Sequence, residues 1–225
     1  MSLFLTGTDT GVGKTFVAIQ LLRLLRSAGI RSAGMKPICC GDRDDARQLL
    51  AVGGEGLTID QINPIWLRSP IAPAVAAQIE RVEIDIDKIG RCFNALSAQF
   101  EVVIVEGVGG WLVPIAPSLS VSDLAKNLDL PVVIVAENRL GCLNHVLLTS
   151  ESVQNRGSKI AGIALNHADA GSDLAQTTNV GELRRLLPDI PVVPVGGTGS
   201  DATSNLASLF EQNLPAAVFK KLTQV

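Results

Sequence analysis

The stretch GTDTGVGKT (residues 7–15) stands between the apolar run SLFLT (residues 2–6) and a segment whose apolar residues recur every three or four positions (residues 14–28). An apolar run, a glycine-rich loop and an amphipathic helix in this order are typical of a phosphate-binding loop. The usual loop has four residues between its first glycine and the Gly-Lys-Ser/Thr triplet, whereas Gly7 stands one residue further back. The stretch is either a glycine-rich turn or a phosphate loop with longer spacing, and its place between strand and helix favours the phosphate loop.

The residue types of this loop suit a triphosphate. Gly11 and Gly13 allow the backbone to curl so that its N–H groups point inward, and the start of the following helix adds partial positive charge. Lys14 can reach the β- and γ-phosphates of ATP, and the Thr15 hydroxyl can bind Mg²⁺. We expect ATP to be bound by Thr10, Gly11, Val12, Gly13, Lys14, Thr15 and Phe16.

Strand-like and helix-like segments alternate along the rest of the chain. Runs such as EVVIVEG (residues 101–107) are apolar without alternation, which is typical of parallel strands covered on both faces. We therefore predict a doubly wound α/β fold of the P-loop NTPase type, with a mostly parallel sheet, helices on both faces and a single domain over residues 1–225. The expected strands are residues 2–6, 31–38, 101–107, 130–136, 159–166 and 190–195, and the expected helices are residues 14–28, 44–52, 71–80, 85–98, 121–128, 140–156, 179–187 and 203–211.

Composition excludes several classes of protein. Hydrophobic residues make up 47% and charged residues 18% of the 225 residues, so disorder is not expected. The net charge of −3 argues against a nucleic-acid surface. We find no signal peptide and no apolar stretch of membrane-spanning length, so no membrane contact is expected. The cysteines lack Cys-x-x-Cys spacing, which favours reduced thiols in the cytoplasm; they are Cys39, Cys40, Cys92 and Cys142.

Polar residues follow the apolar runs, at the sheet edge where ligands of such folds bind. Glu106 ends the run at residues 101–107, where a P-loop protein places the acid that holds its metal ion. The glycines that follow allow close approach of the main chain to a ligand, so Gly107, Val108 and Gly109 join Glu106 as expected ATP contacts. The alternative is an ordinary acid at the end of a strand.

A lysine and a group of acids follow the second expected strand. Lys36 is costly on an apolar strand unless its ammonium emerges into a charged site; the alternative is a lysine that extends to solvent. Asp42, Asp44 and Asp45 could supply one oxygen ligand to Mg²⁺, or they could cap the helix that starts there.

Two later segments carry polar residues with weaker signals. Asn144 and His145 lie in LGCLNH (residues 140–145) at the start of a helix, where packing or interface roles are as plausible as catalytic ones. Asn166 ends the run KIAGIALN (residues 159–166), and its amide could read the edge of an adenine or cap the strand end.

Taken together, these segments resemble the dethiobiotin synthetase family of biotin biosynthesis. The resemblance covers roughly residues 3–195, and members of this family have the longer spacing of the phosphate loop. VEGVGGW and LGCLNH are more specific than the phosphate loop, because general P-loop ATPases lack both. The segments that carry the resemblance are GTDTGVGKT, GMKP (residues 34–37), VEGVGGWLVP (residues 105–114), LPVVIV, LGCLNH and the strand that ends at Asn166.

The resemblance implies a ligase that uses ATP, CO₂ and 7,8-diaminononanoate, through a carbamate and a carbamic-phosphoric anhydride. It implies catalytic roles for Lys14 and Lys36 and a homodimer in which LGCLNH comes from the partner chain. The implied metal ligands are Thr15, Asp45 and Glu106; Asp45 and Asn166 are also implied ATP contacts, with Asn166 at the adenine; and the implied substrate contacts are Lys36, Cys40, Gly109 and Asn144.

The chain departs from the family pattern at two places. Cys40 stands where the family often has serine, and a thiol is a weaker hydrogen-bond partner. Ala-Pro-Ala (residues 72–74) replaces the Ser-Pro-His that begins a helix in the family. Residues 194–201 are expected to border the adenine or ribose.

Two other classes share this type of phosphate loop. A partitioning or positioning ATPase carries a second lysine five residues before the loop lysine, where this chain has Asp9. An amidoligase of the cobyrinic acid synthase type needs a further glutaminase domain, for which 225 residues leave no room.

Overall fold

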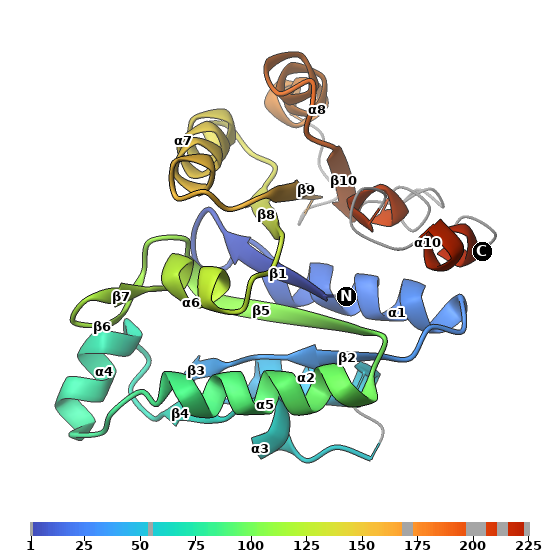
Figure 1. Ribbon diagram of the computed structural model, residues 1–225. Coiled ribbons are helices and arrows are strands. Elements are labelled where there is room, and N and C mark those ends of the chain that lie inside the picture. The colour runs from blue at the N-terminus through green and yellow to red at the C-terminus, as the bar shows by residue number, and fades with distance from the viewer. Residues whose placement is uncertain (1, 54–55, 168–172, 197–205, 211–215, 223–225) are drawn as a thin grey trace.

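A computed structural model describes residues 2–53, 56–167, 173–196, 206–210 and 216–222. Its central sheet has six strands in the order β10-β9-β8-β1-β5-β2, and all neighbours pair in parallel (Figure 1). The bounds are β1 (Ser2–Gly7), β2 (Ser32–Met35), β5 (Val102–Gly110), β8 (Val132–Glu137), β9 (Ile160–His167) and β10 (Val192–Gly196). The predicted parallel sheet is thereby confirmed.

Helices lie on both faces of the sheet, as predicted, with α1 and α2 on one face and α5 and α6 on the other (Figure 1). The helices are α1 (Lys14–Ser27), α2 (Asp44–Gly53), α3 (Ile59–Ile62), α4 (Pro73–Glu80), α5 (Ile86–Gln99), α6 (Val121–Asn127), α7 (Cys142–Asn155), α8 (Leu174–Leu186), the 3₁₀ helix η1 (Ala207–Phe210) and α10 (Ala216–Leu222). Among the described residues, no helix has the length and apolar character needed to cross a bilayer.

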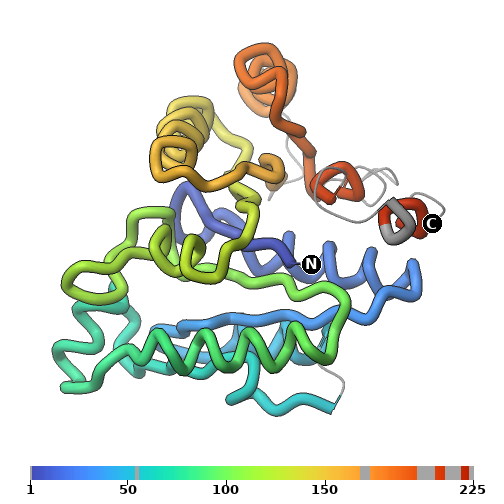
Figure 2. Tube along the Cα trace, viewed as in Figure 1, coloured from blue at the N-terminus to red at the C-terminus, as the bar shows by residue number. Residues whose placement is uncertain are grey.

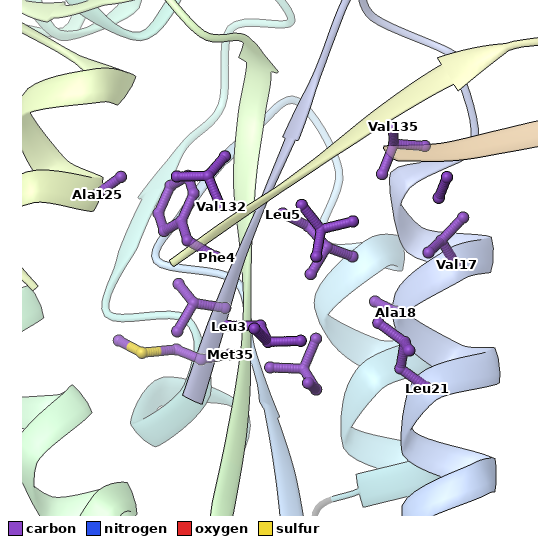
Figure 3. Packing of buried hydrophobic residues seen from close by; sticks show 14 of the residues in the cluster. Leu3, Phe4, Leu5, Val17, Ala18, Leu21, Met35, Ala125, Val132 and Val135 are labelled. Carbon is purple, nitrogen blue, oxygen red and sulfur yellow. The ribbon is translucent and has the colours of Figure 1, made fainter. Parts of the chain in front are cut away.

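The core packs against both faces of β1, because every residue of this strand is buried. Figure 3 shows Leu5 pointing toward Val17 of α1. Phe4, the preceding residue, points to the opposite face, toward Ala125 of α6. A strand with two buried faces must be apolar throughout, which is why SLFLT shows no polar alternation.

The order in which strands are added to the sheet reverses at β1, and this reversal positions the site. From β1 the chain crosses over β5 to reach β2, whereas after β5 it returns past β1 to β8, so the segments after residue 130 form the other half of the sheet (Figure 2). Such a switch leaves a crevice beyond the carboxyl ends of the neighbouring strands. The phosphate loop follows β1 at this crevice.

The single strand predicted over residues 31–38 is wrong. The strand ends at Met35, and the next strand, β3 (Ile38–Cys40), pairs with β4 (Ile65–Leu67) in a separate sheet of two strands. Pro37 lies at the break; it has no N–H to donate, so the ladder of the central sheet cannot continue through it.

Other boundaries also differ from the prediction. The helix expected at residues 179–187 begins earlier, at Leu174, because Asp173 and Gln176 form a capping box. The helix expected at residues 203–211 is described only over residues 206–210, of which Ala207–Phe210 form a 3₁₀ helix; its other residues lie outside the described ones. The prediction also missed α3, α10 and the hairpin of β6 (Pro114–Ala116) and β7 (Leu119–Ser120).

Candidate active site

The phosphate loop joins the end of β1 to the start of α1, and its glycines allow it to fold back on itself. Gly11 and Gly13 have φ angles of 75° and 92°, a left-handed region that residues with a Cβ rarely adopt. A Cβ on Gly7 would lie 2.5 Å from the Asp9 carbonyl oxygen and 2.8 Å from Lys14 Nζ. The early glycine therefore stands where the longer loop closes over the lysine, which favours a phosphate loop over a chance turn.

The ammonium of Lys14 is buried under this loop and bonded to main chain. Its Nζ donates to the Asp9 carbonyl oxygen at 3.0 Å. Burial, and then repulsion by the Lys36 ammonium, lowers the pKa of Lys14 to about 8. Of the residues that the structure describes, none places a carboxylate within ion-pair distance of Lys14, so this cation is arranged to accept the charge of an anionic ligand.

Lys36 is bonded instead to two carboxylates. Its Nζ lies 2.5 Å from Glu106 Oε1 and 2.8 Å from Asp45 Oδ2. The side chains of Lys36 and Glu106 are only 4% and 1% exposed, and Thr15 Oγ1 donates to the same Glu106 oxygen at 2.9 Å. Four predicted residues, from α1, the segment after β2, α2 and β5, therefore meet at one point.

The charges of this cluster support one another. Burial disfavours the Lys36 ammonium, but Glu106 and Asp45 outweigh it and raise the pKa of Lys36 above its ordinary value. Burial likewise opposes ionisation of Asp45, but the Lys36 ammonium and hydrogen bonds from Lys36 and Thr15 lower the pKa of Asp45. A cationic Lys36 and an anionic Asp45 are thus held together.

One buried oxygen in the cluster is available for a metal ion. Glu106 Oε2 is buried and has no hydrogen-bond partner, which is costly for a carboxylate unless a ligand completes it. The described residues contain no group of three or more His, Cys, Asp or Glu side chains able to hold a metal ion. Mg²⁺ takes oxygen ligands and is usually held by one or two carboxylates together with phosphates, so the donor set of Thr15, Asp45 and Glu106 fits that ion.

These groups line a cleft of about 670 Å³ that extends from the phosphate loop to the first residues of α4. The predicted residues that line it are Thr10, Gly11, Gly13, Lys14, Thr15, Lys36, Cys40, Asp45, Glu106, Val108 and Gly109. Sequence reasoning missed the apolar wall of the cleft, which includes Ile38, Ile71 and Val113. Their apolar character alone could not distinguish them from core residues.

The other predicted residues lie outside the lining of the cleft. Val12 and Gly107 are buried in the surrounding core, and a Cβ on Gly107 would contact the ring of Phe4. Phe16 is exposed on α1, and Asn144 is exposed on the first turn of α7. Their assigned contacts with ATP and substrate remain predictions.

Asn166 is hydrogen-bonded to the main chain of the phosphate loop. Its Nδ2 donates to the Val12 carbonyl oxygen at 3.1 Å, and a Cβ on Gly13 would lie 2.1 Å from the same nitrogen. The amide that was expected to read adenine is bonded to the loop in this structure, and the adenine contact remains a prediction. Most of the segment expected to border the adenine or ribose, residues 197–201, lies outside the described residues.

Of the residues at the two departures from the family pattern, Ala74 lines a separate pocket, whereas Cys40, Ala72 and Pro73 lie at the cleft. Cys40 lines it, and burial followed by the charge of Glu80 raises the pKa of the Cys40 thiol to about 11, so the thiol is neutral at pH 7. Ala72 is the N-cap of α4 and supplies no side-chain hydrogen bond to it. All four cysteines lie in the described part of the chain and none forms a disulfide.

Comparison with known folds agrees with the sheet topology. The septum site-determining protein MinD from Pyrococcus horikoshii superposes with a TM-score of 0.54 at 14% identity, covering 100% of this chain and 95% of that one. Cobyrinic acid a,c-diamide synthase from Mycobacterium smegmatis gives a TM-score of 0.53 at 19% identity, covering 91% and 90%. At such identities the likeness concerns the fold alone, and it confirms the predicted P-loop NTPase type.

Sequence comparison is more specific. A family model described as an AAA domain matches residues 1–196. The ATP-dependent dethiobiotin synthetase BioD of Akkermansia muciniphila is 44% identical over 196 residues, 87% of this chain and 90% of that protein. The enzyme of the same name from Aromatoleum aromaticum is 43% identical over 92% of this chain and 95% of its own. With the phosphate loop, Lys36 and Glu106 placed in one cleft and relatives this similar over nearly their full length, the chain belongs to the ATP-dependent dethiobiotin synthetase family.

Proposed function

We propose that the protein closes the ureido ring of dethiobiotin from 7,8-diaminononanoate, CO₂ and ATP, as a ligase of biotin biosynthesis. The observation that carries the proposal is the meeting of Lys14, Lys36 and Glu106 in a single cleft at the phosphate loop. An ATP-driven carboxylation needs a site that holds a triphosphate beside a second anion, and two ammonium groups of this kind supply it.

The triphosphate would lie in the loop of residues 10–16. Inward N–H groups and the start of α1 favour its negative charge, and Lys14 would hold the β- and γ-phosphates. Thr15, Asp45 and Glu106 would hold Mg²⁺, which when bound neutralises phosphate charge and makes the γ-phosphorus easier to attack. The unpartnered Glu106 Oε2 supports this assignment.

The chemistry follows three steps in which bonds and charges balance. One amine of the diamine attacks CO₂ and loses a proton, which gives a carbamate. A carbamate oxygen attacks the γ-phosphorus, and ADP leaves. The second amine attacks the carbamoyl carbon of this anhydride and loses a proton, and inorganic phosphate leaves as the ring closes. Lys36 would stabilise the carbamate and the transferring phosphoryl group, which are both anionic.

We infer that the diamine is bound between two copies of the chain in a homodimer, with Asn144 reaching the substrate from the partner. Exposure of Asn144 on α7, outside the cleft of its own chain, supports a contribution in trans. We also infer that residues 1–225 act as one domain in the cytoplasm, in line with four cysteines that remain thiols.

The test supplies ATP, Mg²⁺ and bicarbonate with and without 7,8-diaminononanoate, and measures phosphate release together with the mass of the organic product. We expect phosphate release that requires the diamine and a product of the mass of dethiobiotin. Diamine-independent hydrolysis that DNA or lipid vesicles stimulate would contradict the proposal and favour a positioning ATPase. Hydrolysis coupled to amidation would favour an amidoligase.

A further inference from the structure

The side chain of Asn63 is a buried polar group that the proposed chemistry does not use. Asn63 follows α3 and is 1% exposed. Its Nδ2 donates to two carbonyl oxygens, that of Lys36 at 2.7 Å and that of Ile65 at 3.0 Å, and its Oδ1 accepts from Arg43 Nε at 2.8 Å. All the hydrogen-bonding capacity of its Nδ2 donors is used, and the amide joins segments that are distant in sequence.

The first of these segments carries the base of Lys36. Lys36 lies at the break between β2 and β3, where the central sheet does not hold its main chain. Its N–H donates to the Ile62 carbonyl oxygen at 2.9 Å and its carbonyl oxygen accepts from Asn63. Both polar main-chain groups of Lys36 are therefore held by two consecutive residues, Ile62 and Asn63.

The second segment carries Asp45. Arg43, two residues before Asp45, donates from Nε to Asn63 Oδ1 and from Nη2 to the Asn63 carbonyl oxygen at 3.0 Å and to Asp60 Oδ1 at 2.8 Å. Its guanidinium also lies 5.4 Å from the ring centre of Trp66. A planar guanidinium with this many fixed contacts holds the start of α2 in one place.

We propose that Asn63, together with Arg43, is a positioning residue that sets the separation of Lys36 from Asp45 and Glu106. The inference deepens the proposed function and rests on it. The ammonium–carboxylate contact of 2.8 Å joins side chains from separate segments. One buried amide bonds the main chain of Lys36 directly and, through the Arg43 side chain, the segment that carries Asp45. Loss of the amide leaves the phosphate loop untouched but frees the base of Lys36 to move.

The test compares the Asn63→Ala and Arg43→Met variants with a matched control, Asn179→Ala. Asn179 is also a buried asparagine, 5% exposed, whose Nδ2 donates to Asn138 Oδ1 at 2.8 Å, but it lies in α8 and contacts no cluster residue. We expect kcat to fall about 10- to 100-fold in Asn63→Ala, since displacement of a catalytic group by about 1 Å costs this much. ADP affinity should change by less than about threefold, and the double variant should be little worse than Asn63→Ala, because both changes act on one linkage.

A second measurement does not depend on turnover. The nucleotide-free protein is treated with an amine-acylating succinimidyl ester, and acylation of Lys36 is followed by mass spectrometry with the exposed Lys126 as internal standard. We expect Lys36 to be protected in the wild type and in Asn179→Ala, and to react faster in Asn63→Ala and Arg43→Met.

The outcomes separate the two ideas. A wild-type protein that does not use the diamine counts against the proposed function only, and the acylation rates still decide the role of Asn63. Unchanged protection of Lys36 in both variants would overturn the positioning role. So would a loss of kcat in Asn179→Ala that matches its loss in Asn63→Ala at equal melting temperature, because general destabilisation would then explain both.

Discussion

The phosphate loop and the cluster around Lys36 lie in the same cleft and bury their lysines in opposite ways. Lys14 is covered by main chain, its Nζ donates to a carbonyl oxygen, and its pKa is lowered to about 8. Lys36 is bonded to two carboxylates, and its pKa is raised against the effect of burial. The first site is incomplete without an anion, whereas in the second the lysine is already paired with carboxylates. The partners of a buried lysine therefore distinguish two roles. A lysine without a carboxylate partner can bind an anionic ligand, whereas one paired with carboxylates keeps the side chains of a site in a fixed arrangement.

The largest expected effect separates the two lysines. In Lys36→Met we expect turnover to fall by about 10²- to 10³-fold, the loss typical of removing one donor to a transition state. ADP affinity should stay near the wild-type value, because the phosphate loop keeps its contacts. In Lys14→Met both turnover and ADP affinity should fall. Turnover is measured as diamine-dependent phosphate release and affinity by calorimetry.

The control for this pair is Lys126→Met, which removes an exposed lysine outside the cleft. Melting curves of all three variants show whether the fold survives, because Glu106 loses its buried partner in Lys36→Met. A folded Lys36→Met protein with near-normal turnover would remove Lys36 from the mechanism. Equal loss of ADP affinity in both cleft variants would mean that the two lysines act as one phosphate site.

A smaller effect is expected from Gly13→Ala, which tests the main-chain part of the loop. Its Cβ would lie 2.1 Å from Asn166 Nδ2, at a φ of 92°. We expect ADP affinity to fall at least about tenfold, together with a stability cost of roughly 1–3 kcal/mol for the strained backbone.

Gly29→Ala is the matched control, because Gly29 also has a positive φ, of 70°, but an added Cβ would meet no atom within 4 Å. It should lose stability through backbone strain while keeping ADP affinity. If Gly13→Ala bound ADP like Gly29→Ala, the close approach of Asn166 would be unimportant for the loop.

The same comparison explains which parts could be predicted from sequence. The phosphate loop is a local pattern, in which glycines, Lys14 and Thr15 follow one another between a strand and a helix. The parallel sheet could be predicted for a similar reason, because strands buried on both faces have no polar alternation. The position of Glu106 beside Thr15 followed from the rule that ligands meet at the carboxyl ends of parallel strands.

The residues around Lys36 depend on contacts between distant segments. The end of β2 before Pro37 is accompanied by the pairing of β3 with β4. Asn63 gave no signal in the sequence, because the Arg43 and Lys36 groups that it bonds lie 20 and 27 positions away. The amide of Asn166 could suit an adenine or a carbonyl oxygen equally well, and only the fold brought it to Val12. Side chains that act through the backbone of another residue leave no local pattern in sequence.

The smallest expected effect concerns Asp123, a carboxylate outside the cleft that pairs with Arg156 at the surface. This pairing contrasts with the buried pairing of Lys36 with Glu106. Asp123 Oδ2 accepts from the Ser120 hydroxyl at 2.6 Å and from the Ser120 N–H at 2.7 Å. These hydrogen bonds, with the Arg156 guanidinium, lower the pKa of Asp123 below its ordinary value. In Asp123→Asn we expect the free energy of unfolding at pH 7 to fall by about 0.5–1 kcal/mol, with diamine-dependent turnover unchanged.

The pH dependence of this difference has a definite sign. A carboxylate whose pKa is lower in the folded state stabilises the fold above its unfolded pKa, and this contribution is lost as pH falls toward the folded value. Urea unfolding of wild type and Asp123→Asn should therefore differ most at pH 7 and converge as pH falls below about 4, from the ordinary aspartate pKa toward the lower folded-state pKa. A difference independent of pH would assign the loss to the geometry of the α6 cap rather than to its charge. Loss of turnover in Asp123→Asn would show that α6, whose first N–H groups bond to Trp111 and Val113 next to the cleft, transmits its position to the site.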